Sequence, residues 1–411
     1  MSSRILIIVE NLTLPLDRRV WQEATTLRDA GHTVSVICPV GGRYAAAYEC
    51  LEGIHIFRHP LPLEASGALG YAIEYASALF WEVVLTWRVR AKVGFDVIQA
   101  CNPPDTIFLI AGFYKYLFGK PFIFDHHDIN PELYEVKFGR RGVFHWLLRT
   151  FERWTFRTAD VSIATNGTFK SIAVTRGGMD PDRVFIVRSI PDLAQFRRTR
   201  PNEALKNGRT TLVGYVGIMG AQDGVDLLVD AMVEIVHKCG RDDIHCAIVG
   251  SGTELDRLKQ QVRAQRLSDY VTFTGFQSGE PLLSALSTFD IGVIPDPKNV
   301  YNDKISMNKI FEYMSLGIPF VQFDLDEGRR IAGDAALYAT DNDPADLARH
   351  ILRLADDTAL RERMAAAGQA RAQAELSWER ERAELLAAYR LALAGAAPAP
   401  VVAGRLASTA S

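Results

Sequence analysis

A lysine and a glutamate lie three residues apart in the segment 302–319, which reads NDKISMNKIFEYMSLGIP. Four apolar residues of this segment recur at the spacing of one helical face, which predicts a helix with that face buried: Met307, Ile310, Phe311 and Met314. Asn308, Lys309 and Glu312 fall on the other side, so we expect their side chains to converge. Gly317 ends the predicted helix, and the run FVQF that follows is typical of a buried strand.

This pair of charges beside a helix N-terminus suits a nucleotide sugar. The ammonium of Lys309 and the free backbone N–H groups of the first helical turn can bind a diphosphate. The carboxylate of Glu312 can accept hydrogen bonds from ribose hydroxyls. The alternative is a surface Lys–Glu pair on an amphipathic helix that binds no ligand. The residues alone leave both interpretations open.

Two shorter motifs follow predicted strands. A Gly-Ser-Gly turn at 250–252 stands between a strand and a helix, where a backbone loop can approach a phosphate, although many such turns need glycine anyway. His126, His127 and Asp128 follow the strand FIFD, and a histidine there can contact a sugar or simply bond neighbouring backbone. Because adjacent side chains of an extended chain point to opposite sides, we expect at most one histidine to face a cleft.

Charged residues also follow the first predicted strand. Asp17 can cap the helix that begins there, with Arg19 and Glu23 as an exposed i,i+4 pair. In the alternative interpretation, Arg18 or Arg19 reaches into the cleft.

The segment 137–157, KFGRRGVFHWLLRTFERWTFR, carries six basic residues and one glutamate. Drawn as a helix, it has an apolar face made of Phe144, Leu147, Leu148, Phe151 and Trp154. The opposite face carries a stripe made of His145, Arg149, Arg153 and Arg157. This pattern is typical of a helix on an anionic membrane surface and also of a core-packed helix with a solvated basic side, so both interpretations stay open. The basic end of 79–92 can extend such a patch.

The composition indicates a globular chain with more than one domain. At 411 residues it is too long for one ordinary core, and 48% hydrophobic and 23% charged residues are typical of soluble globular proteins. A net charge of −3 gives no reason to expect nucleic acid as a partner. The cysteines lack metal-ligand spacing, so we expect reduced packing residues in a cytosolic protein: Cys38, Cys50, Cys101, Cys239 and Cys246.

Neither apolar segment of the N-terminal part predicts membrane targeting. The run in MSSRILIIVEN is too short for a signal peptide and is followed by Glu10 and Asn11, so it predicts a buried strand. The stretch 68–87 has the length of a membrane span but contains Glu74 and Glu82. Each acid would cost about 2.5–3.5 kcal/mol at a bilayer centre, so we expect no transmembrane helix.

Strand-like apolar runs alternate with helix-like segments along the whole chain. This alternation predicts an α/β fold with two Rossmann-like, doubly wound domains that face a central cleft. We assign the N-terminal domain to 1–196, a polar linker to 197–210 and the C-terminal domain to 211–376. A last helix is expected at 377–393, and the small, proline-containing tail 394–411 is expected to be disordered.

From about residue 4 to 393 the chain resembles the retaining GT-B glycosyltransferases of family 4, the group 1 glycosyltransferases. The most specific part is NKIFEYMSLGIP, since KxFEYMxxGxP is a recurring signature of that family. The segments FDLDEGRR and AGDAALY, the strand–GSG–helix unit and the pair His127-Asp128 fit the same pattern. The resemblance implies an acceptor-side N-terminal domain, a nucleotide-sugar-binding C-terminal domain and a final helix that returns to the N-terminal domain.

The resemblance implies sugar transfer from a nucleotide diphosphate donor to an acceptor hydroxyl, with retention and without a metal or other cofactor. Glu312 would hold the ribose hydroxyls, Lys309 would stabilise the departing diphosphate, and His127 would contact the donor sugar near the reacting carbon. The acceptor would attack the face from which the leaving group departs and pass its proton to a phosphate oxygen, so electrostatic stabilisation would be the main catalytic term. Further nucleotide-sugar contacts would come from Gly250, Ser251, Gly252, Asp303, Lys304, Asn308, Glu327, Arg18 and Arg19.

The sequence departs from the family pattern around the diphosphate. The family usually has two glutamates separated by seven residues, but Lys304 stands at the first position, with Asp303 beside it. The Arg and Lys of the first C-domain loop are replaced in GIMGAQDGVD by Ile218 or Met219 and by Asp223. These departures indicate a divergent subgroup, and the substitutes available for the missing cations are Arg18, Arg19, Lys304 and Arg188.

Three functions follow from these observations. The first is a transferase of surface or exported polysaccharide or glycolipid synthesis, acting on a glycan or lipid-linked glycan at the cytoplasmic membrane face, with peripheral contact through 137–157. The second is a non-catalytic GT-B partner or regulator of another transferase, which the missing basic pair favours. The third is a GT-B sugar-nucleotide isomerase, which would convert the donor without an acceptor.

Overall fold

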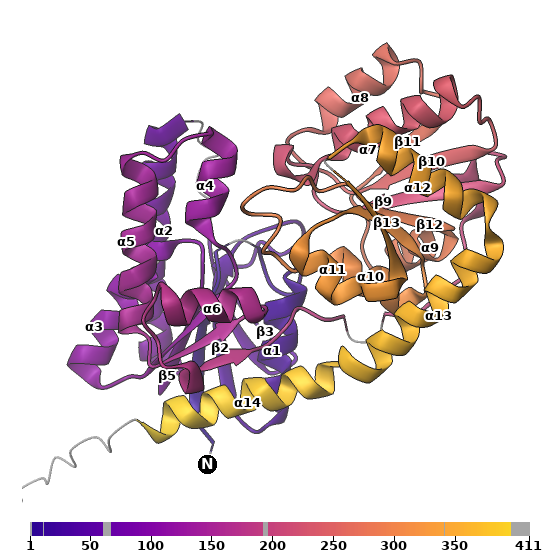
Figure 1. Cartoon of the computed structure of the whole chain (residues 1–411). Helices are drawn as coiled ribbons and strands as arrows, with labels where there is room; N and C mark the ends of the chain where they lie inside the picture. Colours follow the sequence, from indigo (N-terminus) through magenta and orange to yellow (C-terminus); the bar gives the residue numbers. More distant parts are fainter. Residues whose placement is uncertain (1, 11, 61–66, 192–195, 341, 396–411) are drawn as a thin grey trace, which may run out of the picture.

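The computed structural model describes residues 2–10, 12–60, 67–191, 196–340 and 342–395. Figure 1 shows two α/β lobes connected along one side by the last two helices, drawn in yellow. Each lobe contains one sheet with helices on both faces, as the sequence predicts.

The N-terminal sheet has eight strands in the order β3-β4-β2-β1-β5-β6-β7-β8. All neighbours are parallel except the hairpin β3–β4 at one edge. The central strands β1 and β5 are buried from Ile5 to Ile8 and from Val97 to Cys101, and they are largely apolar because helices cover both of their faces. The strands are β1 Arg4–Ile8, β2 Thr33–Pro39, β3 Tyr48–Leu51, β4 Ile54–His59, β5 Val97–Cys101, β6 Phe122–His126, β7 Val161–Ala164 and β8 Val184–Ile186.

The N-terminal helices are α1 Arg18–Asp29, α2 Gly67–Lys92, α3 Phe108–Phe118, α4 Asn130–Phe138, α5 Val143–Thr158 and α6 Gly167–Thr175. Among the described residues, no helix combines the length and the apolar composition that crossing a membrane requires.

The C-terminal sheet has six parallel strands in the order β11-β10-β9-β12-β13-β14. The strands are β9 Thr211–Val216, β10 Ile244–Val249, β11 Val271–Gly275, β12 Ile291–Ile294, β13 Phe320–Phe323 and β14 Ala336–Ala339. The helices are α7 Val225–Val233, continued by a π-helical turn at Glu234–Lys238, α8 Leu255–Ala264, α9 Glu280–Thr288, α10 Asn308–Leu316, α11 Asp326–Ala332, α12 Pro344–Asp356, α13 Thr358–Glu375 and α14 Trp378–Ala394.

Helices α13 and α14 lead from the C-terminal lobe back to the N-terminal one (Figure 1). Helix α13 packs against α10, and α14 packs against β7 and β8. Four side chains of α14 enter the core on one face of the N-terminal sheet: Leu385, Ala388, Tyr389 and Ala392. The boundaries that we propose, 1–196 and 211–376, place one sheet in each domain, and the tail 396–411 lies outside the described residues.

The linker is docked on the C-terminal domain rather than extended through solvent. Arg198 donates from Nε to the carbonyl of Leu316, 2.6 Å away, and from Nη2 to the carbonyl of Gly317, 3.0 Å away. The backbone N–H of Asn202 donates to the hydroxyl of Thr288 at 2.8 Å.

The basic segment 137–157 covers the end of α4, a left-handed turn at Gly139 and most of α5, which begins at Val143. On α5 the predicted apolar face does not pack on the core at Phe144 and Trp154, which are exposed. The inward side of α5 is made of Glu152, Thr155 and Phe156. Cys50 and Cys239 are exposed, whereas the other three cysteines are buried as expected, and all five are free thiols.

Candidate functional site

Helix α10 brings the signature residues to the boundary between the domains. Its apolar face is buried as predicted, and Gly317 ends it in the left-handed conformation at φ +62°. Glu312 and Lys309 are largely buried, and each is paired with a separate group rather than with the other. The convergence that the spacing predicts is therefore replaced by two distinct ion pairs.

Glu312 is bridged by an arginine of the N-terminal domain. Nη2 of Arg18 lies 2.5 Å from Oε1 of Glu312. Arg18 is the first residue of α1, which Asp17 caps as predicted by accepting a backbone N–H of the first turn. The guanidinium of Arg18 also lies 5.9 Å from the centre of the Phe196 ring. Of the two adjacent arginines, Arg18 is thus the one that reaches the opposite domain.

Lys309 is held by carboxylates of its own domain. Its Nζ lies 2.6 Å from Oδ2 of Asp296, which follows β12, and 4.8 Å from the centre of the Tyr215 ring. Burial lowers the pKa of Lys309, but the charge of Asp296 outweighs it and raises that pKa above its usual range. Burial raises the pKa of Asp223 to about 6, although the charge of Lys309 opposes the shift. One ammonium therefore faces two carboxyl groups.

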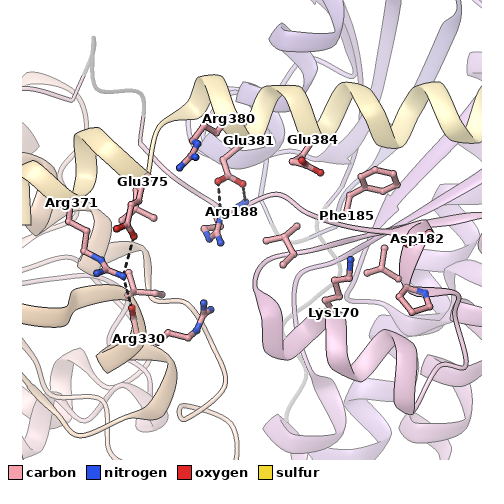
Figure 2. A pocket seen from close by; sticks show the side chains of 15 residues that line it. Lys170, Asp182, Phe185, Arg188, Arg330, Arg371, Glu375, Arg380, Glu381 and Glu384 are labelled. Carbon is pink, nitrogen blue, oxygen red and sulfur yellow. Dashed lines mark hydrogen bonds and ion pairs between the residues drawn. The ribbon is translucent and has the colours of Figure 1, made fainter.

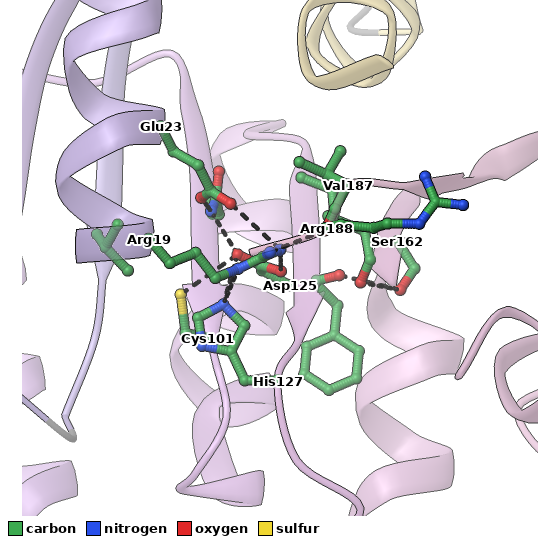
Figure 3. A network of polar contacts seen from close by, with 12 residues as sticks. Arg19, Glu23, Cys101, Asp125, His127, Ser162, Val187 and Arg188 are labelled. Carbon is green, nitrogen blue, oxygen red and sulfur yellow. Dashed lines mark hydrogen bonds and ion pairs between the residues drawn. The ribbon is translucent and has the colours of Figure 1, made fainter. Parts of the chain in front are cut away.

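His127 belongs to a buried polar network at the carboxyl end of β6 (Figure 3). Its Nε2 lies 2.8 Å from Oδ2 of Asp125 and 2.9 Å from Nε of Arg19. Nη2 of Arg19 donates to Oδ1 of Asp125 at 2.9 Å and lies 3.2 Å from Glu23. Both partners of the Arg19–Glu23 pair are buried, so the prediction that the pair is exposed is wrong. Removing Arg19 from Asp125 would leave a buried charge unpaired, so Arg19 is unsuited to a diphosphate.

The two adjacent histidines point to opposite sides, as the alternation of an extended chain predicts. His126 is fully buried among the rings of Phe124, Phe156 and Phe169. Burial lowers the pKa of His126 to about 3, so this ring is neutral. The pKa of His127 is raised instead, because the charge of the carboxylate beside it outweighs the effect of burial.

The loop before α10 contacts the N-terminal domain at several points. The hydroxyl of Tyr301 donates to Oδ1 of Asp128 at 2.8 Å. Nζ of Lys304 lies 3.1 Å from Oε1 of Glu132. Nδ2 of Asn166 donates to the backbone carbonyl of Lys304 at 2.9 Å. Lys304 is thus paired with a carboxylate of α4, and Asp128 is bound by the opposite domain.

Three other predicted site residues lie around the same loop. Asp303 caps α11 by accepting its first backbone N–H at 2.8 Å. Glu327 is buried, accepts from the hydroxyl of Ser306 at 3.0 Å and is paired with Arg330. Asn308 is exposed at the first residue of α10. Asp303 and Glu327 are therefore engaged in holding the loop and α11 together.

The Gly-Ser-Gly turn after β10 packs against the turn after β9. A Cβ on Gly250 would lie 1.8 Å from the carbonyl oxygen of Gly217, and one on Gly252 would lie 2.4 Å from that of Met219. The backbone N–H of Met219 donates to the carbonyl of Ser251 at 3.0 Å. Chain packing alone therefore requires both glycines, and contact between this turn and a phosphate stays a prediction.

A cavity of about 770 Å³ lies between the domains beside α14 (Figure 2). Two ion pairs lie within its wall. Nη1 of Arg188 lies 2.9 Å from Oε1 of Glu381, and Nη2 of Arg371 lies 3.3 Å from Oε2 of Glu375. Arg188 is thus held on α14, which makes it a poor substitute for the missing diphosphate cations.

One group in the described part of the chain has metal-ligand atoms close together. Cys101, Asp125 and His127 each place one such atom within 4.8 Å of the others. Arg19 lies against both Asp125 and His127, so a bound cation would face its guanidinium. The group is better explained as an ion-pair network than as a metal site.

Two family models match the chain, one on each side of the linker. The model described as Glycosyltransferase Family 4 matches residues 16–194, and that described as Glycosyl transferases group 1 matches residues 210–357. The chain belongs to glycosyltransferase family 4. This confirms the resemblance drawn from the signature of α10.

The chain is also similar to individual proteins and solved structures. The alpha-D-kanosaminyltransferase of Streptomyces kanamyceticus is 25% identical over 320 residues, 74% of this chain and 80% of that protein. The solved sucrose-phosphate synthase of Thermosynechococcus elongatus matches with a TM-score of 0.78 at 20% identity, over 95% of this chain and 99% of its own. The HepE protein of Anabaena, solved in complex with UDP, matches with a TM-score of 0.69 at 17% identity, over 94% and 99%. The solved structures confirm the GT-B fold.

The sequence analysis missed the groups that bind the candidate residues. Two of them, Asp125 and Asp296, could have been found, because each occurs at the carboxyl end of an apolar strand. Glu132 and Tyr301 act across the domain boundary, and no local pattern indicates such partners.

Proposed function

We propose that this family 4 transferase moves a sugar from a nucleotide diphosphate donor to an acceptor hydroxyl, with retention and without a metal. The observation that carries the proposal is the position of α1 between the two candidate groups. Arg18 contacts Glu312, the carboxylate proposed for ribose, and the next residue, Arg19, contacts His127, proposed for the donor sugar. The UDP complex of the similar HepE protein supports a nucleotide diphosphate donor.

In the proposed reaction, the bond between the anomeric carbon and the diphosphate oxygen breaks. The acceptor oxygen forms the new bond on the same face of the sugar, and its proton passes to a phosphate oxygen of the leaving group. Stabilising the charge on that leaving group is the main task of the protein.

Arg18 is the best placed of the candidate cations for this task. Its side chain is 59% exposed, and the buried Glu312 carboxylate that it would leave is the group proposed to bind the ribose hydroxyls, which can take its place. The side chains of Arg19, Arg188 and Lys304 are less exposed, at 7%, 26% and 35%, and each is held by a carboxylate for which no ligand is proposed. When ribose hydroxyls take Glu312, Arg18 is released toward the diphosphate. Lys309 and the N-terminus of α10 add a weaker contribution, because two carboxyl groups offset the ammonium.

We also propose that the acceptor is a glycan or lipid-linked glycan of surface polysaccharide or glycolipid synthesis, used at the cytoplasmic membrane face. Support comes from an outward apolar face on α5, where Val143 and Trp146 are 73% and 63% exposed. Basic residues of α5 lie beside this face, as in helices that bind anionic lipid. Helices α2 and α3 also carry exposed apolar side chains: Phe80, Val83, Trp87, Leu109, Phe113, Tyr116 and Leu117.

Thermal unfolding with a panel of nucleotides tests the donor site. UDP, GDP, dTDP and their sugar derivatives are compared on wild type and Glu312→Ala. A ligand at a hundred times its Kd stabilises by about 2.7 kcal/mol, which a melting curve resolves. We expect a shift with one nucleotide that Glu312→Ala loses, followed by nucleotide release when donor and lipid-linked acceptors are combined.

The same experiment separates the other two functions. Binding of a nucleotide sugar without turnover on any acceptor would indicate a non-catalytic partner, which the pairing of Lys309 with Asp296 favours. Conversion of the donor in the absence of acceptor would indicate an isomerase. No stabilisation by any nucleotide would contradict the proposed donor site.

A further inference from the structure

A buried chain of polar side chains connects the returning helix α14 with His127. The hydroxyl of Tyr389, on α14, contacts Oε1 of Gln99, on β5. Nε2 of Gln99 donates to Oδ2 of Asp125 at 3.0 Å and to Oε2 of Glu23 at 2.7 Å. Figure 3 shows the end of this chain, where Asp125 meets His127. We call four of these side chains the relay: Tyr389, Gln99, Asp125 and His127.

The hydrogen bonds of Gln99 fix the orientation of its amide. Both hydrogens of Nε2 are directed at carboxyl oxygens, so Oε1 is left to accept. The hydroxyl of Tyr389 is therefore the donor, and burial raises its pKa well above the usual range, which keeps the proton in place. Gln99 and Tyr389 are 0% and 1% exposed, so water cannot replace either group.

The protonation state of His127 decides which neighbour its Nε2 binds. Its Nε2 donates to Asp125 when it carries a proton and accepts from Arg19 when it does not, but it cannot do both. The charged or titratable groups around the ring are Arg19 and Glu23 of α1, Asp125 of β6, the thiol of Cys101 of β5, and Asp128, which follows His127 in the chain. The negative charge of Asp125 favours the protonated form, in which Nε2 is bound to the sheet.

We propose that Tyr389 and Gln99 are positioning residues, which hold Asp125 and through it fix the imidazole of His127 with its Nε2 proton directed at the sheet. Helix α14 follows the C-terminal domain in the chain. It thus takes part in setting the geometry and protonation of His127, which belongs to the N-terminal domain. The importance of this ring for sugar transfer rests on the proposed function, whereas the relay itself does not.

Two variants of α14 separate the relay from ordinary helix docking. Tyr389→Phe removes only the hydroxyl that Gln99 accepts from. Trp378→Phe removes another hydrogen bond between α14 and the N-terminal domain, from Nε1 to the hydroxyl of Thr26 at 3.0 Å, which does not touch the relay. The pKa of His127 is measured by NMR of ¹⁵N-histidine-labelled full-length protein, with His127→Ala identifying its signals. This readout needs no substrate.

We expect Tyr389→Phe to lower the pKa of His127 by about half a unit, because Asp125 is then held less firmly against the imidazolium that it stabilises. Trp378→Phe should leave that pKa unchanged. Once donor and acceptor are known, Tyr389→Phe should lower kcat about threefold or more with little change in the KM for donor. An unchanged pKa in Tyr389→Phe, or an equal shift in both variants, overturns the proposal. Gln99→Asn, which shortens the amide, provides the second test if Tyr389→Phe does not fold.

Absence of any sugar transfer would contradict the proposed function but leave the pKa result standing. The two failures are therefore distinguishable.

Discussion

Arg18 and Glu312 meet across the domain boundary, with Nη2 of the arginine 2.5 Å from Oε1 of the glutamate. The carboxylate is 6% exposed and the guanidinium 59% exposed, so an exposed cation covers a buried anion. Ribose hydroxyls and Arg18 therefore compete for the same oxygen in the proposed function.

Replacing Arg18 should separate ribose binding from diphosphate binding. In Arg18→Ala we expect the affinity for the nucleoside diphosphate to fall about tenfold, because hydrogen bonds to charged groups are worth about 1.5–3 kcal/mol. The affinity for the nucleoside alone should not fall, since the competitor for Glu312 is gone. Calorimetric titration of both ligands measures the difference. Glu312→Ala is the control and should weaken both, and equal losses for both ligands in Arg18→Ala would refute the assigned role.

Nucleotide-sugar affinity should depend on the ionisation of Asp223. Its pKa is raised to about 6, so it is neutral below that pH and anionic above it. The anion opposes a diphosphate, so we expect Kd to increase about fivefold between pH 5.5 and 7.5, equivalent to about 1 kcal/mol of repulsion. A nucleotide sugar is the ligand of choice, because the terminal phosphate of a free nucleoside diphosphate also titrates near pH 6.

Asp223→Asn supplies the matched variant for that measurement. We expect it to bind as tightly at pH 7.5 as the wild type does at pH 5.5, with a flat profile between them. An unaltered pH profile in Asp223→Asn would show that another group is responsible.

The buried pair of Lys309 and Asp296 should be costly to break from one side. Lys309→Met leaves Asp296 buried without a partner, and we expect a loss of about 3–5 kcal/mol in the free energy of unfolding. Replacing both residues, as Lys309→Met with Asp296→Leu, should restore most of that loss because no buried charge remains. Urea unfolding followed by circular dichroism provides the comparison, and a double variant no more stable than the single one would be the contrary result.

Gly250 should be required for the fold even without ligand. Its φ of +141° and the close carbonyl of Gly217 leave no room for a side chain. We expect Gly250→Ala to lower the free energy of unfolding by about 2 kcal/mol or more. Ser251→Ala, on an exposed neighbour, should change it by less than about 0.5 kcal/mol. Equal stability of both variants in ligand-free protein would argue that this turn tolerates a Cβ.

The exposed start of α5 should govern lipid binding. A triple variant, Val143→Ser with Phe144→Ser and Trp146→Ser, should weaken sedimentation with vesicles of anionic lipid at least about tenfold, because it removes apolar area that inserts. Phe276→Ser, at an equally exposed aromatic of the C-terminal domain, is the control and should have no effect. Binding of the triple variant at the wild-type level would exclude this face as the contact.

Most strands could be predicted because parallel strands covered on both faces form continuous apolar runs. The apolar run in MSSRILIIVEN became β1, and FIFD became part of β6. The hairpin β3–β4 was missed, since Tyr48–Leu51 lies at a sheet edge and alternates between exposed and half-buried side chains. Its turn at Glu52 and Gly53, both with positive φ, was the signal available in the sequence.

The candidate site was predictable only where its chemistry is local. The signature of α10 places Lys309 and Glu312 on one helix, and that shared helix follows from spacing. The partner of Glu312 stands 294 residues away in the chain, and nothing in either segment indicates the pairing. For Arg19 the local pattern gave the right partner but the wrong environment. An i,i+4 pair such as Arg19 and Glu23 usually lies on the surface, but here it is buried under α14.

The position of α14 also has a consequence for how the molecule is made. A ribosome produces the N-terminal sheet first, but part of the cover for one face of that sheet comes from Leu385, Ala388 and Ala392. Until the C-terminal domain has been synthesised, this face remains an apolar surface open to chaperones. The N-terminal domain is therefore synthesised first, but its core is complete only after α14, which follows the C-terminal domain in the chain, has been made.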